Sequence, residues 1–141
     1  MYAYIIVQPH DFQVWDEIGK ALEDDEQRAS LLTKASSYCE YFERIVGICV
    51  EAAKKVHFEG RECYFATAIP QITMRSEIAQ QLYKKLPPFA LIVTAHPDGF
   101  GVSIRSDGSV DASKIAEKYG GGGHPGSAGF FIPNGEKMPW V

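Results

Sequence analysis

The sequence predicts an α/β fold: a mixed β-sheet with helices packed on it, preceded by a long N-terminal helix. Two patterns lead to this prediction. From residue 61 onward, short apolar segments follow one another in the order strand, helix, strand, strand, helix, strand, and before them an apolar stripe repeats at spacings of three and four. The chain has 141 residues, 45% of them hydrophobic, which is enough for one ordinary core. We therefore expect an N-terminal strand and helical connector over residues 1–60 and an α/β domain over residues 61–141.

The N-terminal part is expected to open with a strand and to continue as a long helix. Tyr2 to Val7 form a short apolar run, and a further short segment extends from Asp11 to Leu22. The acidic residues 23–26 suit the start of a helix, where negative charge is stabilised. The stripe then predicts a helix of about 28 residues, with Gly60 marking its exit. Its apolar positions are Leu31, Ala35, Tyr38, Phe42, Ile45, Cys49, Ala52 and Val56.

The C-terminal part begins with a predicted strand and helix. β-Branched and aromatic residues from Glu62 to Ile69 indicate a strand that Pro70 ends. The next element has Thr73 as its N-cap and is stopped by Pro87-Pro88. Its apolar helical face consists of Ile78, Ala79, Leu82, Tyr83 and Leu86.

Two further strands are expected to pair as an antiparallel hairpin. Phe89–Ala95 and Phe100–Arg105 flank His96-Pro97-Asp98-Gly99, which has turn chemistry. If the first of these strands is parallel to the strand before it, their crossover is expected to be right-handed. The apolar residues of the second strand alternate onto one face. The other face is polar and uncluttered, as suits a ligand, and carries Gly101, Ser103 and Arg105.

A last helix and strand complete the predicted domain. Asp111 is the expected N-cap, and Val110 and Ile115 form a hydrophobic staple. The helix ends at Gly120, a glycine-rich loop follows, and a short strand extends from Gly129 to Ile132.

Charge and cysteine content exclude several classes of protein. Residues 1–70 carry 7 basic and 12 acidic side chains and residues 71–141 carry 7 and 6, so an anion is better accommodated in the C-terminal half. Three cysteines without a C-x-x-C spacing argue against a disulfide framework and a zinc site, and they favour a cytoplasmic location. The run from Tyr2 to Val7 is too short to span a membrane, so no membrane association is expected.

Residues 120–129 hold six of the 13 glycines. Capping and turn formation account for about three of them. The surplus suggests that a ligand approaches the backbone, or that successive N–H groups converge on an anion. A G-x-G-x-x-G pattern occurs at Gly121, Gly123 and Gly126, but it leaves a helix and enters a strand, which is the reverse of a dinucleotide-binding loop. Arg105 and His124 are then the candidate side chains for an anion.

The sequence lacks the residue groupings of a catalytic centre. The histidines at positions 10, 57, 96 and 124 are scattered, with no neighbouring carboxylates that would complete a metal site. No nucleophile elbow is present, and no cysteine has a local histidine. We therefore predict no catalytic residue, no metal ligand and no cofactor in this chain, which is expected to bind rather than to cut.

Three segments in order resemble the C-terminal domain associated with DHH phosphoesterases of the RecJ-like and oligoribonuclease-like kind. They are Val-Ser-Ile-Arg-Ser at 102–106, Val-Asp-Ala-Ser-Lys-Ile-Ala at 110–116, and Gly-Gly-Gly-His-Pro-Gly-Ser-Ala-Gly at 121–129. Upstream, Ser76-Glu77-Ile78 and the long helix resemble the lead-in of that domain, so the likeness covers residues 25 to 133.

The resemblance implies a division of labour. In the family, a separate DHH domain holds manganese or a similar divalent ion and hydrolyses the substrate, while this domain grips a phosphate or terminal nucleotide. Arg105 matches the family's phosphate-contacting arginine, and Ser127 replaces a commoner alanine. The implied substrate-binding residues are Ser103, Arg105, Ser106, Gly121, Gly122, Gly123, His124, Ser127, Ala128 and Gly129.

Several functions are compatible with these observations. The first is the substrate-binding half of a DHH-type phosphoesterase acting on a phosphorylated small molecule or short single-stranded nucleic acid, with hydrolysis only in combination with a DHH partner. The second is a stand-alone nucleic-acid-binding module, like the related domain of alanyl-tRNA synthetases. The third is a structural domain.

Apart from Lys84-Lys85, the C-terminal half lacks a basic cluster, which favours short ligands. The apolar face of the long helix is either core or a docking surface for a catalytic partner or a second copy. Tyr119 and Phe100 are expected in the core.

Overall fold

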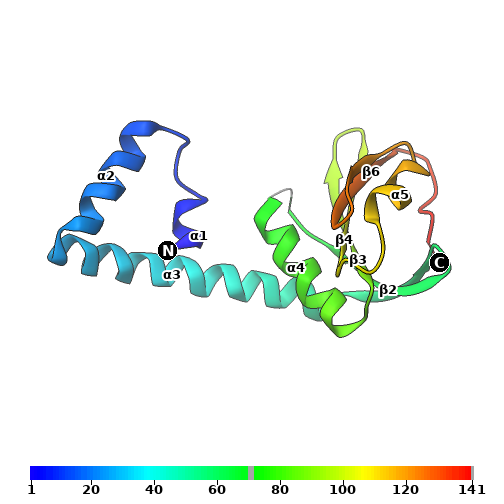
Figure 1. Ribbon diagram of the computed structural model, residues 1–141, viewed down its shortest axis with the longest axis horizontal. Coiled ribbons are helices and arrows are strands. Elements are labelled where there is room, and N and C mark those ends of the chain that lie inside the picture. Colours follow the sequence, from blue (N-terminus) through cyan, green and yellow to red (C-terminus); the bar gives the residue numbers. More distant parts are fainter. Residues whose placement is uncertain (70–71, 141) are drawn as a thin grey trace. The chain divides into compact units, whose positions relative to one another are not determined.

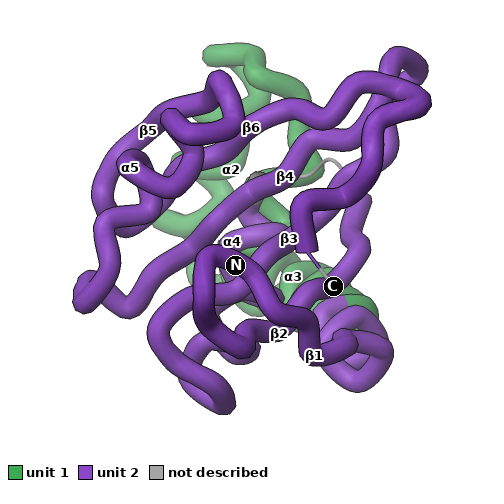
Figure 2. Tube along the Cα trace, turned by 90° about the vertical axis from the view of Figure 1, so that its right-hand side faces the viewer, with its two compact units in different colours: residues 1–45 green, residues 46–141 purple. Residues whose placement is uncertain are grey.

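The computed structural model describes residues 1–69 and 72–140, and the chain divides into two compact units, residues 1–45 and 46–141 (Figure 2). We call them unit 1 and unit 2 and describe each by itself. Residues 46–60, which the sequence assigned to the N-terminal connector, belong to unit 2.

The regular elements of unit 1 are all helices, and the prediction of an opening strand is wrong. Residues Tyr2–Ile5 form one helical turn, α1, and Tyr4 of that turn packs edge-on against Tyr38 at 5.3 Å between ring centroids. A lone strand would have had no partner for its backbone groups, whereas the N–H groups of Tyr4 and Ile5 donate to the carbonyl of Met1. The second helix, α2, spans Phe12–Glu23 and begins at Asp11, which accepts a hydrogen bond from the Gln13 N–H at 2.7 Å.

The long helix exists, but it ends earlier than the apolar stripe suggests. Helix α3 spans Asp25–Glu51, and Asp24 accepts a hydrogen bond from the Gln27 N–H at 2.8 Å at its start. Val56, the last member of the stripe, lies in a strand instead. Val56 and Phe58 are two residues apart, and together they form the inward side of that strand. The four-residue spacing from Ala52 to Val56 therefore matches a helical repeat although Val56 lies in a strand.

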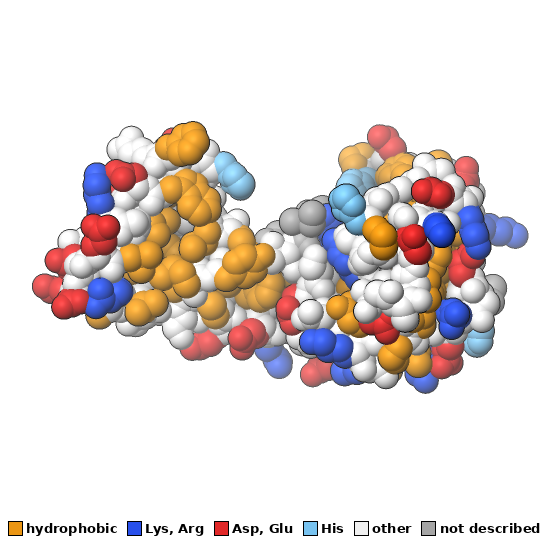
Figure 3. Space-filling model, viewed as in Figure 1, with side chains coloured by type: hydrophobic (Ala, Val, Ile, Leu, Met, Phe, Trp, Pro, Cys, Tyr) orange, Lys and Arg blue, Asp and Glu red, His pale blue; other side chains and the backbone are white. Residues whose placement is uncertain are grey.

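Unit 1 also exposes large apolar side chains. Figure 3 shows hydrophobic side chains gathered on the side of α3 that α1 and α2 face. The most exposed is Phe12, at 96%.

Unit 2 is built on a sheet that, in the described residues, has six strands in the order β1-β2-β3-β4-β6-β5. These strands are β1 Lys54–Phe58, β2 Arg61–Thr67, β3 Phe89–His96, β4 Gly99–Ser106, β5 Gly122–His124 and β6 Ser127–Pro133. The mixed sheet is confirmed: β2 and β3 run parallel and the other neighbours are antiparallel. The two strands that the sequence analysis missed, β1 and β5, lie at the two edges.

The two helices of unit 2 flank the sheet. Helix α4, Ile72–Lys85, connects β2 to β3 and ends before Pro87, as expected. Pro70 lies outside the described residues, and Thr73, expected as the N-cap, is inside the helix. Helix α5, Ala112–Glu117, begins at Asp111, which accepts hydrogen bonds from the N–H groups of Ser113 and Lys114.

The helices cover opposite faces of the sheet (Figure 1). On one face, α5 packs with a core cluster that includes Phe89, Leu91, Val102 and Ile104. On the other face, α4 buries Ile78, Ala79 and Leu82 completely, and β3 contributes Ala90 and Ile92. Since side chains alternate along a strand, the residues of β4 that point away from the core cluster lie on the α4 side.

Candidate functional site

Strand register brings the predicted polar residues into rows across the sheet. Arg105 pairs with Ser127, which pairs with His124, and Ser103 pairs with Gly129 in the neighbouring row. Side chains of residues directly opposite each other lie on the same face of a sheet. Arg105 and His124 therefore lie on the α4 face with Ser127 between them. Their Cα atoms are roughly 10 Å apart, which is two strand spacings.

Helix α4 adds two residues that the sequence analysis did not place in the site. Arg75 donates through Nη1 to the Ser103 hydroxyl at 3.1 Å, and Arg105 donates through Nη2 to the Ser76 hydroxyl at 3.3 Å. A signal for Arg75 was present in the sequence. It stands three and four residues before Ile78 and Ala79, so it shares the apolar face that α4 turns toward the sheet. A cation in that position needs a polar space to point into.

In the part of the chain that the structure describes, the two arginines have no acidic counterpart. Within the described residues, no carboxylate lies within 4.0 Å of the guanidinium group of Arg75 or Arg105. The pKa of Arg105 is lowered, mainly by burial and further by the positive charge of Arg75. The Nε atom of Arg75 is buried and has no hydrogen-bond partner in the described part of the chain. Two converging guanidinium groups with unused donors form a site that an anion would complete.

A surface hollow of about 360 Å³ lies beside Arg75. Its volume falls within the usual range for small-molecule sites. The hollow is lined by Arg75, Gly101, Val102, Ser103, Gly120, Gly121, Gly129, Phe130 and Phe131. It joins the polar positions of β4 to the glycine-rich segment, which are the two features that the sequence analysis connected.

Backbone packing explains more of the glycines than the sequence analysis allowed. A Cβ atom on Gly121 would lie 2.1 Å from the Gly129 carbonyl oxygen, and one on Gly123 would lie 2.6 Å from the Ser127 carbonyl oxygen. The expected convergence of N–H groups on an anion is also wrong for the first two glycines, because the N–H groups of Gly120 and Gly121 donate to carbonyls at the end of α5. The segment after them is not a loop but the edge strand β5.

Two predicted site residues point away from the arginines. The Ser106 hydroxyl donates to the Val110 carbonyl at 2.7 Å and accepts a hydrogen bond from the Gly108 N–H at 3.1 Å, so it holds the turn before α5. Ala128 belongs to the core cluster. By contrast, Ser103, Arg105, Gly122, His124, Ser127 and Gly129 share the α4 face.

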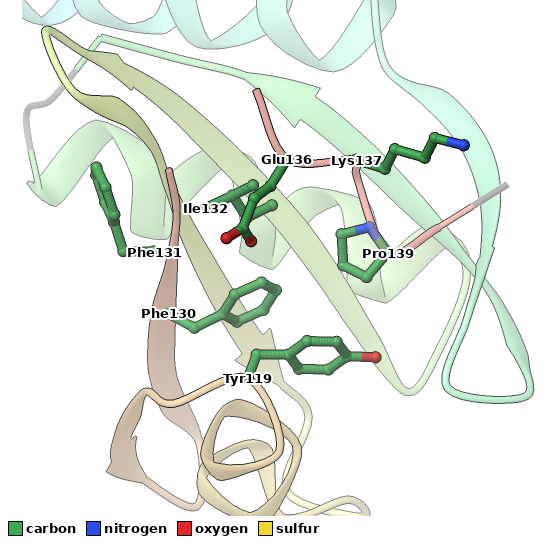
Figure 4. A pocket seen from close by; sticks show the side chains of 7 residues that line it. All are labelled: Tyr119, Phe130, Phe131, Ile132, Glu136, Lys137 and Pro139. Carbon is green, nitrogen blue, oxygen red and sulfur yellow. The ribbon is translucent and has the colours of Figure 1, made fainter. Parts of the chain in front are cut away.

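Other parts of the described chain offer less. A second hollow of about 150 Å³ lies under the C-terminal segment and is lined by Tyr119, Phe130, Phe131, Ile132, Glu136, Lys137 and Pro139 (Figure 4). It contains no pair of cations. Burial raises the pKa of the Cys63 thiol to about 12, which makes it a poor nucleophile.

The described residues form neither a metal site nor a membrane helix. Among them, no three His, Cys, Asp or Glu side chains come together as a metal site would require, so they do not fit a divalent ion. The helices of the described chain include none with the length and apolarity needed to cross a bilayer.

The chain is similar to one protein family and to several solved structures. The model of the DHHA1 domain family matches residues 65–140. An exopolyphosphatase-related protein from Bacteroides fragilis is similar over 92% of this chain and 40% of its own, with 15% identity and a TM-score of 0.51. An uncharacterized protein from Helicobacter pylori G27 is similar over 60% of this chain and 23% of its own, with 24% identity and a TM-score of 0.47.

A third structure, a pGpG-specific phosphodiesterase from Vibrio cholerae, is similar over 84% of this chain and 40% of its own, with 14% identity and a TM-score of 0.45. The chain thus spans between 23% and 40% of these three structures. A search of curated proteins found no match.

Proposed function

The chain belongs to the DHHA1 domain family, the accessory domain of DHH-family phosphoesterases, and we propose that its α4 face binds the phosphate of a nucleotide or short oligonucleotide. One observation carries this proposal: Arg75 lines a hollow and is near enough to Arg105 for their positive charges to interact, and no described carboxylate neutralises either of them. A cation pair of this kind costs stability unless an anion binds to it, because desolvation and like-charge repulsion both oppose it.

The geometry suits a phosphate group bound on the α4 face of the sheet. The guanidinium of Arg105 is partly buried and already oriented by the Ser76 hydroxyl, while Arg75 is oriented by Ser103. Pre-orientation lowers the entropy lost when a ligand binds. His124 is exposed at the outer end of the Arg105 row and supplies a further hydrogen-bond donor to a longer ligand. Each bond from a charged donor to phosphate contributes roughly 1.5 to 3 kcal/mol.

Binding without hydrolysis is the role proposed for the chain alone. A divalent ion would supply phosphoester hydrolysis with a metal-activated water, but the described residues hold no ligand set for it. We propose that a DHH catalytic domain provides that chemistry and that this domain holds the phosphorylated end of the substrate. The local charge favours short ligands, since residues 71–141 carry only one more basic than acidic side chain.

A binding titration tests the proposal. The 141-residue chain is titrated with AMP and with a short oligoribonucleotide, and the same titration is repeated with Arg105→Ala. Arg61→Ala is the matched control, because Arg61 is exposed at the start of β2, far along the sheet order from β5. We expect saturable binding that Arg105→Ala weakens at least tenfold, or about 1.4 kcal/mol, and that Arg61→Ala leaves unchanged. Equal affinity in all three proteins would contradict the proposed site.

A further inference from the structure

We propose that the ring of Phe131 is a stacking platform for a nucleobase, so that the site selects nucleoside phosphates over other phosphorylated compounds. The inference rests on the proposed phosphate site, since Phe131 lines the same hollow as Arg75. It concerns a residue that the sequence analysis did not consider for the site.

Phe131 is oriented unlike its neighbours on β6. Phe130 and Ile132 are 6% and 4% exposed and belong to the core cluster, whereas Phe131 is 45% exposed. Figure 4 shows its side chain leaving the strand on the side opposite to theirs. Phe131 pairs with Gly101 of β4, so its ring lies on the same face as Ser103 and Arg105.

The separation between the ring and the phosphate site suits a nucleotide. The row containing Gly101 and Phe131 is two residues along the sheet from the row containing Ser103 and Gly129. Two residues of strand correspond to roughly 7 Å between the two backbone rows, and the ring extends farther from Ser103, since its Cζ atom would lie 2.9 Å from a Cβ atom on Gly99; a nucleotide that reaches both groups is therefore bound in an extended form. Arg75 donates to Ser103 itself, so a phosphate on Arg75 would place the base near the ring.

His96 and Gly101 together fix the orientation of the Phe131 ring. The ring meets His96 edge-on, with centroids 6.0 Å apart and an interplanar angle of 67°. His96 is in turn positioned by the Thr94 hydroxyl, 3.2 Å from its Nε2 atom. Between the ring and Ser103 stands Gly101, where a Cβ atom would lie 2.9 Å from the same His96 nitrogen. The His96 imidazole therefore occupies the place that a side chain at position 101 would take, and it supports the Phe131 ring at its edge.

A single exposed phenylalanine is common on protein surfaces and needs no functional explanation by itself. Phe131 differs because it lines a hollow shared with an arginine that lacks a counterion among the described residues. Aromatic rings beside cationic groups are the usual means of holding a base and its phosphate without reading the base sequence. The Phe131 platform is thus expected to accept different bases with similar affinity.

The test compares AMP with ribose 5-phosphate, which carries the same phosphate without a base. For the wild-type chain we expect AMP to bind more tightly. Phe131→Leu is expected to weaken AMP binding roughly 5- to 10-fold and to leave ribose 5-phosphate binding unchanged. Phe131→Tyr keeps a stacking ring and should bind AMP as tightly as the wild type. The comparison with Phe131→Leu therefore separates loss of the ring from other effects of the substitution. Phe12→Leu, which alters an exposed phenylalanine of unit 1, is the matched control.

The outcomes separate this inference from the function on which it rests. Equal affinity of wild type for the two ligands, or an unaltered AMP affinity in Phe131→Leu, would overturn the platform and leave the phosphate site standing. Failure of both ligands to bind the folded wild-type chain would overturn both proposals.

Discussion

Replacing Arg75 by methionine should weaken ligand binding without destabilising the free protein. Arg75 makes one hydrogen bond in the described chain, from Nη1 to the Ser103 hydroxyl, and leaves its buried Nε without a partner. Methionine retains an unbranched apolar stem of similar length, so the contacts of that stem with α4 and β4 are largely kept.

The substitution has opposite effects on the stability of the free protein and on that of the ligand-bound protein. In the free protein, loss of the bond to Ser103 costs about 1 kcal/mol, and an unsatisfied buried donor that costs about 1 to 3 kcal/mol is removed. Burial is the main cause of the lowered pKa of Arg105, and the repulsion by Arg75 that adds to it is removed as well. With ligand bound, one charged donor to phosphate is lost, which is worth roughly 1.5 to 3 kcal/mol or about 10- to 150-fold in affinity.

Two measurements on the same samples check this reasoning. Isothermal titration with AMP should show the loss of affinity, and thermal denaturation of the free chain should show a midpoint equal to or above that of wild type. The bound protein should lose part of its ligand-induced stabilisation. The reasoning is refuted if Arg75→Met clearly lowers the melting midpoint while AMP affinity stays at the wild-type value, because Arg75 would then be a structural residue.

Three further predictions concern stability. Gly123→Ala should lower the free energy of unfolding by roughly 1 to 3 kcal/mol in chemical denaturation, because its φ is 146° and its Cβ would collide with β6, whereas Gly122→Ala, with open space around it, should have little effect. Glu59 accepts a hydrogen bond from the Tyr119 hydroxyl at 2.7 Å and forms an ion pair with Lys118; the bond to Lys118 is the main cause of its lowered pKa. The stability that Glu59 contributes is therefore present above the pKa of an unfolded glutamate and is lost as pH falls through the lower pKa of Glu59 in the folded protein. Glu59→Gln should reduce this dependence in melting curves measured at different pH values. Burial raises the pKa of Tyr119 to about 12, with the Glu59 bond as a further cause, so its contribution is complete below pH 10 and should decline as pH rises toward 12.

Local patterns predicted the elements whose signals were self-contained. The Asp111 cap and the Pro87-Pro88 stop act through neighbouring residues, and the structure confirms both helix ends. The hairpin of β3 and β4 was likewise predicted from its turn sequence and from alternation. Alternation also placed Ser103 and Arg105 on one face before any partner strand was known.

The errors arose where a short apolar run is ambiguous without its partners. Tyr2–Ile5 has the composition of a strand but has no strand to pair with, so a helical turn satisfies its backbone. Lys54–Phe58 became an edge strand because β2 was available to pair with it. The expectation that surplus glycines imply a ligand failed in part for the same reason, since the close approach at Gly121 and Gly123 is to β6 of the chain itself.

The sequence by itself determined the family, the fold class and the arginine at the end of β4. These depend on motifs and periodicities that extend over a few residues to a few turns. Only the tertiary structure decided that Arg75 would stand near Arg105, thirty positions away in the numbering, and that Phe131 would line the same hollow as Arg75. Such neighbours are set by strand register and by the packing of α4 on the sheet, and both are properties of the whole core rather than of any segment.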